Sequence, residues 1–408
     1  MALICASAFA QSRKPFYGHD AERPGARHRI EPSDLPPPFA TRSSSQLQIV
    51  GRPQGAMPQV PKGFKTEVYS TGYARIRLMR TAPNGDVFAS DHGSGDIWVL
   101  RGVDASGRCI TRKRFAHAGQ GPYGIAFYPP GPDPRWVYVA NLDNVVRFPY
   151  TRGDLESRGA AQVVVDHLPT RGHFTRDVAF SPDAQHMFVA IGSMSNVDDP
   201  DRNPGERGRA CVWMARPDGT GMRVFASGTR NPSSIVFSPQ TGQLWASVIE
   251  RDGLGDDLVP DYLTHLERDG FYGWPYCYTG SHRDPRLGQQ HPELVRVSRT
   301  PDVLLQPHGS PLQMMFYPGG NLGRAYRGQI FATLHGSWNR SVPTGSVVVH
   351  VFVDASGRPT GEYEDFVTGF YLPDGRVWGR PVGVTAAADG ALLVSDDASN
   401  TIWRVSRQ

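Results

Sequence analysis

A repeat that recurs along most of the chain restricts the possible folds more than any other feature. Each copy has an apolar strand, then a turn built from Pro, Asp, Asn or Gly, then a second apolar strand. A β-sandwich does not repeat at this period and a solenoid repeats more tightly, whereas a four-stranded propeller blade with loops of varying length fits it. The turn positions stand 46 to 79 residues apart, at Pro83, Pro129, Pro182, Pro239, Pro318 and Ala388.

Six copies predict an all-β fold, a six-bladed β-propeller with four-stranded antiparallel blades around a central channel, over residues 62–408. Many copies are followed by a third apolar strand, as at 96–100 and 144–148. Blades supply a rigid frame, so function is expected in the loops around the channel. The longest inserts, at about 192–209 and 248–307, are the expected rims of a site.

The first 61 residues lack the repeat. Residues 1–10 are apolar and end in Ala8-Phe9-Ala10, which resembles a signal-peptide cleavage site without the basic start. We interpret them as the remnant of a signal peptide that begins upstream, which predicts a periplasmic or secreted protein. Residues 11–61 are rich in Pro, Ser, Arg and Gln, and we expect an extended leader rather than a domain.

Charge and cysteine content argue against several classes of function. The net charge of +4 is scattered and its basic clusters are short, so nucleic-acid binding is not expected. No apolar run approaches the roughly 20 residues of a membrane span. If Cys5 leaves with the signal remnant, Cys109, Cys211 and Cys277 allow one disulfide of open pairing, and no Cys-x-x-Cys-His motif for c-type haem is present.

Two polar segments precede expected inner strands. The imidazole of His173 would face the channel there, and its pKa near neutrality suits it to accept a proton, although a structural histidine is the alternative. Arg230 and Asn231 stand at the equivalent place one blade later. They offer donors to a planar, oxygen-rich anion, or a clamp between blades.

An acidic loop and a polar segment complete the candidates. Residues 250–257, Glu-Arg-Asp-Gly-Leu-Gly-Asp-Asp, expose oxygens of the kind that Ca²⁺ prefers, although the spacing is not that of an EF-hand. Residues 335–340, His-Gly-Ser-Trp-Asn-Arg, follow an apolar strand, and Arg380 precedes the last blade. The chain has no G-x-S-x-G elbow and no G-x-G-x-x-G between a strand and a helix, which disfavours a serine hydrolase and a nicotinamide site.

Together, these segments resemble the glucose/sorbosone dehydrogenase family from about residue 63 to the C-terminus. The specific elements are Arg230-Asn231, residues 250–257 with Gly-Phe-Tyr-Gly-Trp-Pro at 270–275, and residues 335–340. The amino-acid sequences of these segments are most similar to those of the sorbosone dehydrogenase branch. The resemblance implies a propeller that uses pyrroloquinoline quinone (PQQ) and Ca²⁺ to oxidise a sugar or polyol, with electrons passed to an external acceptor such as a cytochrome or a quinone.

The resemblance also implies a role for each matching residue. His173 would take the hydroxyl proton, Arg230 would polarise the quinone carbonyl, and Gln120 would lie beside the substrate. Main-chain oxygens of Asp252 and Gly253 would bind Ca²⁺. The residues implied to hold the cofactor are Arg230, Asn231, Trp338, Asn339, Arg340 and Arg380.

The chain departs from the family pattern in three places. Glucose-oxidising relatives have a carboxylate after Ile-Gly that orients the base, whereas here Ser193 follows, and Asp177 or Asp198 is the expected replacement. A lysine that those relatives use on the cofactor is replaced within 338–340, and a second arginine of the last blade is replaced by Val382.

Two other functions fit a propeller of this kind. A calcium-dependent lactone hydrolase would need carboxylates from several blades on the channel axis, whereas this sequence gathers its acids in one loop. A non-enzymatic binding propeller would not need His173 and Arg230 to converge.

Overall fold

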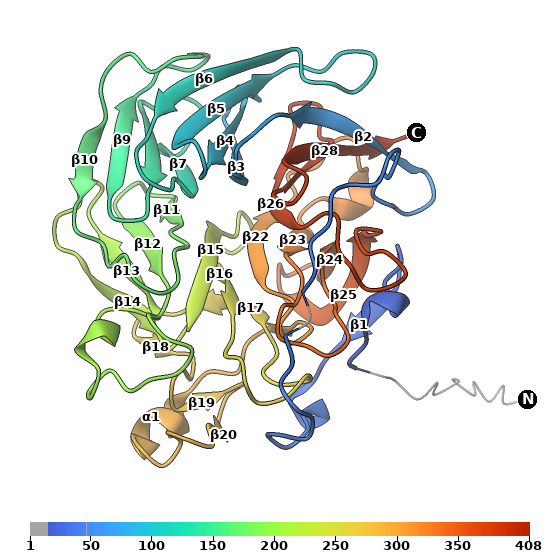
Figure 1. Ribbon diagram of the computed structural model, residues 1–408. Helices are drawn as coiled ribbons and strands as arrows, with labels where there is room; N and C mark the ends of the chain where they lie inside the picture. The colour runs from blue at the N-terminus through green and yellow to red at the C-terminus, as the bar shows by residue number, and fades with distance from the viewer. Residues whose placement is uncertain (1–14, 46) are drawn as a thin grey trace, which may run out of the picture.

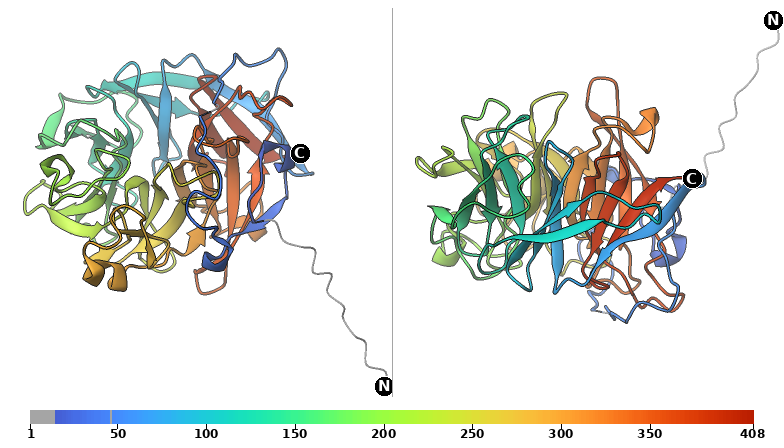
Figure 2. Two further views of the ribbon diagram at one scale, coloured as in Figure 1. Left: turned by 60° about the horizontal axis from the view of Figure 1, so that its bottom comes forward. Right: turned by 90° about the horizontal axis from the view of Figure 1, so that it is seen from above.

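Six antiparallel sheets surround a central axis in the computed structural model, which describes residues 15–45 and 47–408 (Figure 1). Four sheets have four strands, and the third and fifth blades each carry one additional strand. The side view in Figure 2 shows the blades side by side around the axis. The predicted six-bladed propeller is confirmed.

The first three blades follow one another along the chain. The first contains β3 (Ile76–Thr81), β4 (Val87–Asp91), β5 (Asp96–Arg101) and β6 (Thr111–His117). The second contains β7 (Gly124–Tyr128), β8 (Trp136–Ala140), β9 (Val145–Pro149) and β10 (Gln162–Val165). The third contains β11 (Val178–Phe180), β12 (Met187–Ile191), β13 (Cys211–Ala215) and β14 (Arg223–Ser227), with β18 (Gly270–Phe271) parallel to β14.

The remaining blades complete the ring. The fourth contains β15 (Asn231–Phe237), β16 (Leu244–Ile249), β17 (Tyr262–Leu266) and β21 (Val303–Leu304). The fifth contains β22 (Pro311–Phe316), β23 (Ile330–Leu334), β24 (Val347–Val353) and β25 (Pro359–Val367), with β1 (Arg27–Arg29) at its edge. The sixth contains β26 (Pro381–Ala386), β27 (Leu392–Asp396), β28 (Thr401–Arg407) and β2 (Phe64–Thr71).

Both ends of the propeller meet in the sixth blade. Strand β2 comes from the start of the repeat region and pairs antiparallel with β28, from Phe64 opposite Arg407 to Thr71 opposite Thr401. The ring is therefore closed by main-chain hydrogen bonds between distant parts of the chain, which leaves no open gap between the first and last blades.

The leader lies against the last two blades. Strand β1 pairs with β25, and single bridges join Gln59 to Thr368 and Ile49 to Val377. The leader also contains the short helices η1 (His19–Ala21) and η2 (Pro32–Asp34). In Figure 2 it is the blue segment that crosses the orange and red strands.

The core fills the spaces between blades. Inner strands such as β22 and β26 are buried along their whole length, and Trp245, Trp378 and Trp403 are among the largest fully buried side chains. Burial of a large apolar side chain contributes roughly 1.5–3 kcal/mol. The alternating Val, Ile and Phe of the repeat thus hold neighbouring blades at a fixed angle.

Four of the inner strands have an irregular register at the same end. The irregularities lie between Ile76 and Met79, Pro232 and Ser234, Pro311 and Met314, and Pro381 and Gly383. A bulge bends a strand and re-aims its side chains. Residues just before these positions are therefore placed at one mouth of the channel.

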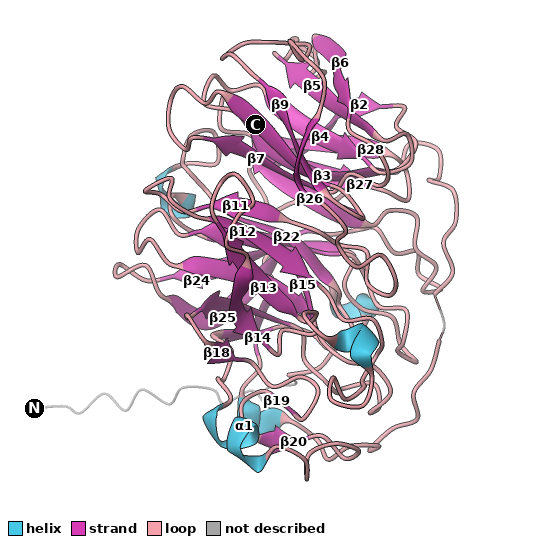
Figure 3. Cartoon of the chain, turned by 90° about the vertical axis from the view of Figure 1, so that its left-hand side faces the viewer, coloured by secondary structure: helices cyan, strands magenta, loops and turns pink. Residues whose placement is uncertain are grey.

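In the part of the chain that the structure describes, helices are few and peripheral, as Figure 3 shows. Besides η1 and η2 they are η3 (Pro204–Glu206), η4 (Arg324–Tyr326) and α1 (Pro292–Val297), and α1 stands near the hairpin of β19 (Cys277–Tyr278) and β20 (His282–Arg283). Among the described residues, no helix is long and apolar enough to cross a membrane.

The three cysteines that the structure describes do not pair. Cys109, Cys211 and Cys277 are free thiols, and the last two are buried. Cys5 and the predicted cleavage motif at Ala8-Phe9-Ala10 lie outside the described residues.

Candidate active site

A cavity of about 660 Å³ lies where the inner strands begin. It gathers side chains from five blades and from both predicted inserts. Eight of the ten predicted site residues line it, together with several that sequence reasoning missed. The lining residues with a charged, imidazole or amide side chain are Arg75, Arg77, His173, Asn196, Arg230, Asn231, Asp252, His335, Asn339 and Arg380. Gly253 and Trp338 also line the cavity.

Two predicted site residues lie elsewhere. Gln120 is exposed, does not line the cavity, and accepts a main-chain hydrogen bond from Leu142. Arg340 is buried, and its guanidinium binds the carboxylate of Asp257 at 2.7 Å and the amide oxygen of Gln306 at 3.4 Å. Arg340 thus joins two loops behind the cavity wall.

A second hollow, of about 1030 Å³, lies at the other ends of the inner strands. Among the described residues that line it, the only ionisable side chains besides Tyr317 are Arg80 and Arg327. It offers no imidazole or carboxylate for proton transfer, so the chemistry-bearing groups lie at the first mouth.

His173 stands just before β11 with one ring nitrogen fixed. Its Nδ1 lies 2.8 Å from the main-chain oxygen of Ser193 and 3.0 Å from the Ser193 hydroxyl. A nitrogen this close to a carbonyl oxygen must carry the proton, so Nε2 has the lone pair. Burial, helped by the positive charge of Arg230, lowers the pKa of His173 to about 3. The ring is therefore a neutral base at neutral pH.

Neither carboxylate expected to orient this ring does so. Asp177 is fully buried and binds Arg80 at 2.8 Å and the main-chain N–H of Ile235 at 2.9 Å. Asp198 accepts a hydrogen bond from Asn203 at 2.8 Å. The expectation is corrected: Ser193 itself, through its carbonyl and hydroxyl oxygens, orients His173.

A second imidazole in the cavity does have a carboxylate partner. Nε2 of His335 lies 2.8 Å from Asp397 Oδ1, and the other oxygen of Asp397 binds Arg77 at 2.6 Å. Burial, together with the charge of Arg380, lowers the pKa of His335 to about 4, although Asp397 opposes this shift. His335 is therefore a neutral imidazole, and its Nδ1, which has no hydrogen-bond partner among the described residues, can accept a proton.

Asn196 connects Arg230 to the acidic loop. Its side-chain oxygen accepts hydrogen bonds from Arg230 Nη2 at 3.0 Å and from the Asp252 main-chain N–H at 2.8 Å. Its side-chain nitrogen donates to the Asp252 carbonyl at 2.9 Å. Arg230 also donates to the carbonyls of Asn196 at 3.0 Å and Glu250 at 2.6 Å. One amide thus fixes the guanidinium and the loop together.

The insert that carries Asn196 is folded by a buried carboxylate. Glu206, on η3, accepts main-chain hydrogen bonds from Met194 at 2.8 Å and from Ser195 at 2.7 Å. It is 1% exposed, so both bonds are shielded from water. Glu206 lies twelve positions after Met194 and eleven after Ser195, and its hydrogen bonds turn the loop back on itself. This turn brings the next residue, Asn196, to the cavity.

The TrAA12-like family model matches residues 58–408. This chain belongs to the TrAA12-like family. It is 25% identical over 378 residues to an uncharacterized protein of Borreliella burgdorferi, across 88% of this chain and 94% of that protein. It is 26% identical, over an alignment of 434 residues, to the pyrroloquinoline quinone-dependent pyranose dehydrogenase of Coprinopsis cinerea, and it matches 57% of that protein's length.

Solved structures share the fold of this TrAA12-like chain. The PQQ domain of the Coprinopsis cinerea pyranose dehydrogenase, in its holo form, superposes with a TM-score of 0.73 at 24% identity, over 89% of this chain and all of that domain. A Trichoderma reesei carbohydrate-active enzyme of family AA12 superposes with a TM-score of 0.73 at 20% identity, over 90% of this chain and all of that structure.

Three of the arginines around the cavity of this TrAA12-like chain occupy equivalent positions in different blades. Arg75, Arg230 and Arg380 each directly precede an inner strand. Arg75 and Arg77 both lie 5.5 Å over the ring of Phe174, and Arg380 donates to the His335 carbonyl at 3.0 Å. Four guanidiniums thus face one cavity, whose only described acidic lining residue is Asp252. The resulting positive electrostatic potential, together with the planar guanidinium groups, favours an anionic, planar ligand.

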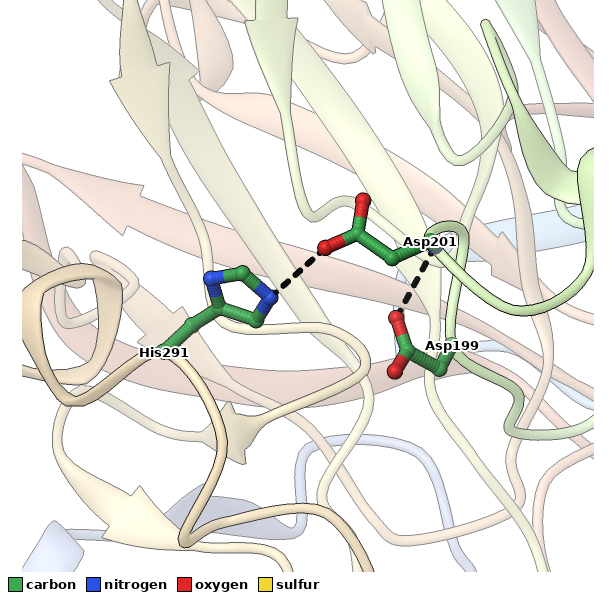
Figure 4. Close-up of side chains that lie close together, drawn as sticks. All are labelled: Asp199, Asp201 and His291. Atoms are coloured by element: carbon green, nitrogen blue, oxygen red, sulfur yellow. Dashed lines mark hydrogen bonds and ion pairs between the residues drawn. The ribbon is translucent and has the colours of Figure 1, made fainter.

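An acidic cluster lies apart from this cavity. Asp199, Asp201 and His291 lie close enough to share a metal ion (Figure 4). His291 instead binds Asp201 at 3.0 Å and Glu293 at 2.9 Å, and Asp199 accepts from Tyr276 at 3.0 Å. None of the three lines the cavity, and each already has a protein partner.

Proposed function

We propose that this protein is a dehydrogenase that oxidises a hydroxyl group of a sugar or polyol, with PQQ as its cofactor. The observation that carries the proposal is the convergence of His173, whose Nε2 has the lone pair, with four arginines in one cavity. Membership of the TrAA12-like family and the likeness to a PQQ-dependent pyranose dehydrogenase support it.

The chemistry of the lining fits PQQ. PQQ is a planar quinone with three carboxylates, so it needs positive charge and donors for carbonyl oxygens. Arg75, Arg77 and Arg380 supply guanidiniums at the cavity wall, and Asn231 adds an amide. The side-chain oxygen of Asn231 accepts from Thr175 at 2.7 Å, which leaves its N–H groups as donors.

The residues of the chain then provide the acid–base chemistry. When bound, PQQ supplies a two-electron acceptor for hydride. His173 would accept the hydroxyl proton at Nε2, while Ser193 holds Nδ1–H and keeps the ring in this tautomer. Arg230 fixes positive charge beside the developing alkoxide, and its hydrogen bonds to Asn196 and Glu250 prevent it from turning away.

Trp338 is the proposed platform for the sugar. It lines the cavity, yet its side chain belongs to a residue that is 46% exposed. A large aromatic face left open at a mouth offers the apolar surface on which a sugar ring packs, with the hydroxyls free for polar partners. We therefore place substrate between Trp338 and His173.

The main-chain oxygen of Asp252, one of the two donors expected for the calcium ion that the resemblance implies, is already occupied. The Asp252 carbonyl already accepts hydrogen bonds from Arg251 and Asn196, and the Asp252 carboxylate binds His308 at 3.0 Å. We therefore assign no step to calcium.

The two alternative functions are less consistent with the site. A lactone hydrolase with a calcium centre on the channel axis needs carboxylates from several blades, whereas Asp252 is the only acidic residue among the described lining residues. A pure binding propeller does not require His173 and Arg230 to converge, and they do.

Export and an external electron acceptor complete the proposal. Export is proposed from the Ala8-Phe9-Ala10 motif, which lies outside the described residues. A cytochrome or a quinone is the proposed class of acceptor, and Gln120 stays a predicted substrate neighbour.

The test is reconstitution of the purified protein with PQQ. We expect a change in the PQQ absorption spectrum on binding, and dye reduction that depends on an added aldose or polyol. A Gln185→Ala variant, an exposed change far from the cavity, is the matched control. Absence of both PQQ binding and sugar-dependent reduction would overturn the proposal.

A further inference from the structure

The main-chain carbonyl of Asp252 is held by a guanidinium. Nε and Nη2 of Arg251 both lie 3.1 Å from the Asp252 oxygen, and Asn196 Nδ2 lies 2.9 Å from it. Three N–H donors thus meet one carbonyl oxygen, which has two lone pairs. This oxygen has no unused lone pair to offer a cation while Arg251 stays in place.

Arg251 is fixed by a buried ion pair. Its Nη1 binds the carboxylate of Asp284, and the side chains are 7% and 2% exposed. Moving Arg251 away would leave the Asp284 carboxylate buried without its partner, which is strongly unfavourable. The guanidinium is therefore a permanent part of the loop.

The Asp252 carboxylate is occupied as well. Arg230 Nη2 lies 3.6 Å from one carboxylate oxygen. Nδ1 of His308 lies 3.0 Å from Asp252 Oδ1, and its Nε2 lies 2.9 Å from the Gly255 carbonyl oxygen. A divalent cation on the Asp252 carbonyl would therefore meet the guanidiniums of Arg251 and Arg230 at close range.

We infer that Arg251 takes the place of a divalent cation on the Asp252 carbonyl. Positive charge at the Asp252 carbonyl then comes from the chain itself, anchored by Asp284, and this carbonyl needs no Ca²⁺. Where it concerns PQQ, the inference rests on the proposed function: PQQ binds with equal affinity in the presence and absence of Ca²⁺.

Terbium luminescence tests the cation site without any cofactor. Trp274 donates from its indole to the Asn196 carbonyl at 2.9 Å, so it lies close enough to sensitise Tb³⁺ bound at the Asp252 carbonyl. An Asp201→Asn background weakens the acidic cluster of Figure 4 as a second Tb³⁺ site. We expect no luminescence that depends on Trp274, as judged against Trp274→Phe. Trp274-dependent emission that Ca²⁺ displaces would overturn the inference.

Removal of the guanidinium should create the missing site. The double variant Arg251→Gln, Asp284→Asn removes both buried charges together, so no unpaired charge is left. We expect this variant to gain Tb³⁺ emission that Ca²⁺ displaces. Arg283→Gln, an exposed arginine on the neighbouring hairpin, is the matched control and should behave as the parent does.

PQQ titration separates this inference from the proposed function. In the parent we expect the Kd for PQQ to change by less than about twofold between EDTA and excess CaCl₂, and in the double variant to be about tenfold weaker in EDTA. Parent protein that binds PQQ only with Ca²⁺ would contradict the inference and leave the proposed function intact. Parent protein that binds no PQQ under either condition would contradict the proposed function, while the Tb³⁺ measurement still decides the inference.

Discussion

His335 donates from Nε2 to Asp397 Oδ1 over 2.8 Å, whereas His173 donates from Nδ1 to a main-chain carbonyl. The cavity thus contains two neutral imidazoles, and a carboxylate supports only one of them. A carboxylate behind an imidazole stabilises the charged ring that forms on proton uptake. Asp397, however, also binds Arg77, so its charge is shared between His335 and the guanidinium of Arg77.

Replacement of each histidine by glutamine, in separate variants, tests which of the two accepts the proton. We expect His173→Gln to lower kcat/KM by about 10²–10⁴ while PQQ still binds, because the loss removes the base and not the arginines. We expect His335→Gln to lower kcat/KM less and to weaken PQQ binding, because Asp397 loses its contact with His335 and no longer holds Arg77 in the same position. Steady-state kinetics and PQQ titration of both variants check this. A reversed order would assign the base to His335.

Proton NMR of the histidine rings tests the pKa of His173. Since burial and Arg230 lower this pKa to about 3, its ring should not titrate across about pH 5–8, where an unperturbed imidazole does. Activity of the reconstituted enzyme should then show no loss with a midpoint at about pH 6.5. His265 and His291 are internal controls, because hydrogen bonds to Asp302 and Glu293 raise their pKa values. Titration of the His173 ring near neutrality would contradict the assignment.

The sequence could predict the ring and eight of the residues that line the cavity. The inner strands were visible because each ends in a turn with Pro, Asp or Gly, and Arg230 and Asn231 were visible because they precede one of them. The same position before β3 would have revealed Arg75, since Arg75 and Arg230 occupy equivalent places. That recurrence is the signal that was missed.

The pairing of side chains could not be predicted. Asp397 lies 62 positions after His335, and Asn196 lies 56 positions before Asp252, with no local pattern that links them. Such contacts depend on how the loops of neighbouring blades fold over the mouth. For the same reason the ion pair of Arg340 with Asp257 could not be predicted, and contact of Arg340 with the cofactor stays a prediction.

Asn196 should prove important for cofactor affinity. Asn196→Ala removes the acceptor for Arg230 and the donor for the Asp252 carbonyl, so both groups lose their common anchor. With about 1 kcal/mol for each of these two hydrogen bonds, we expect PQQ to bind roughly thirtyfold more weakly. Asn203→Ala, in the same insert but outside the cavity lining, is the control for a general loosening of the loop. Equal effects of the two variants would contradict a specific role of Asn196.

The role of Arg340 can be decided by a double-mutant cycle with Asp257. If the pair clamps two loops, Arg340→Gln and Asp257→Asn should each weaken PQQ binding, and the double variant should be little worse than either alone. The coupling free energy of such a partly buried pair should be about 1–3 kcal/mol. If Arg340 instead touches the cofactor, Asp257→Asn should leave the Kd for PQQ unchanged.

The leader touches the acidic loop that borders the cavity. The Thr41 hydroxyl oxygen accepts a hydrogen bond from the Asp256 main-chain N–H at 2.7 Å, and the Phe39 N–H donates to the Leu254 carbonyl at 2.8 Å. Gly255, between these contacts, has a φ of +112°, and a Cβ there would stand 2.9 Å from the Thr41 hydroxyl. The leader therefore packs directly on this loop from outside.

Replacement of Thr41 should lower the affinity for PQQ and leave the thermal stability of the fold little changed. Thr41→Val keeps the shape and removes the acceptor for Asp256, a loss of about 1 kcal/mol that falls on the acidic loop. We expect the Kd for PQQ to rise about threefold to tenfold, and Thr41→Ser to restore it. Thr66→Val removes a hydroxyl that donates to the Pro58 carbonyl at 2.9 Å, and it is the matched control on the sixth blade. A contact that positions the acidic loop must change cofactor binding. If both valine variants instead lower the thermal midpoint equally and neither changes the Kd for PQQ, the leader only stabilises the ring.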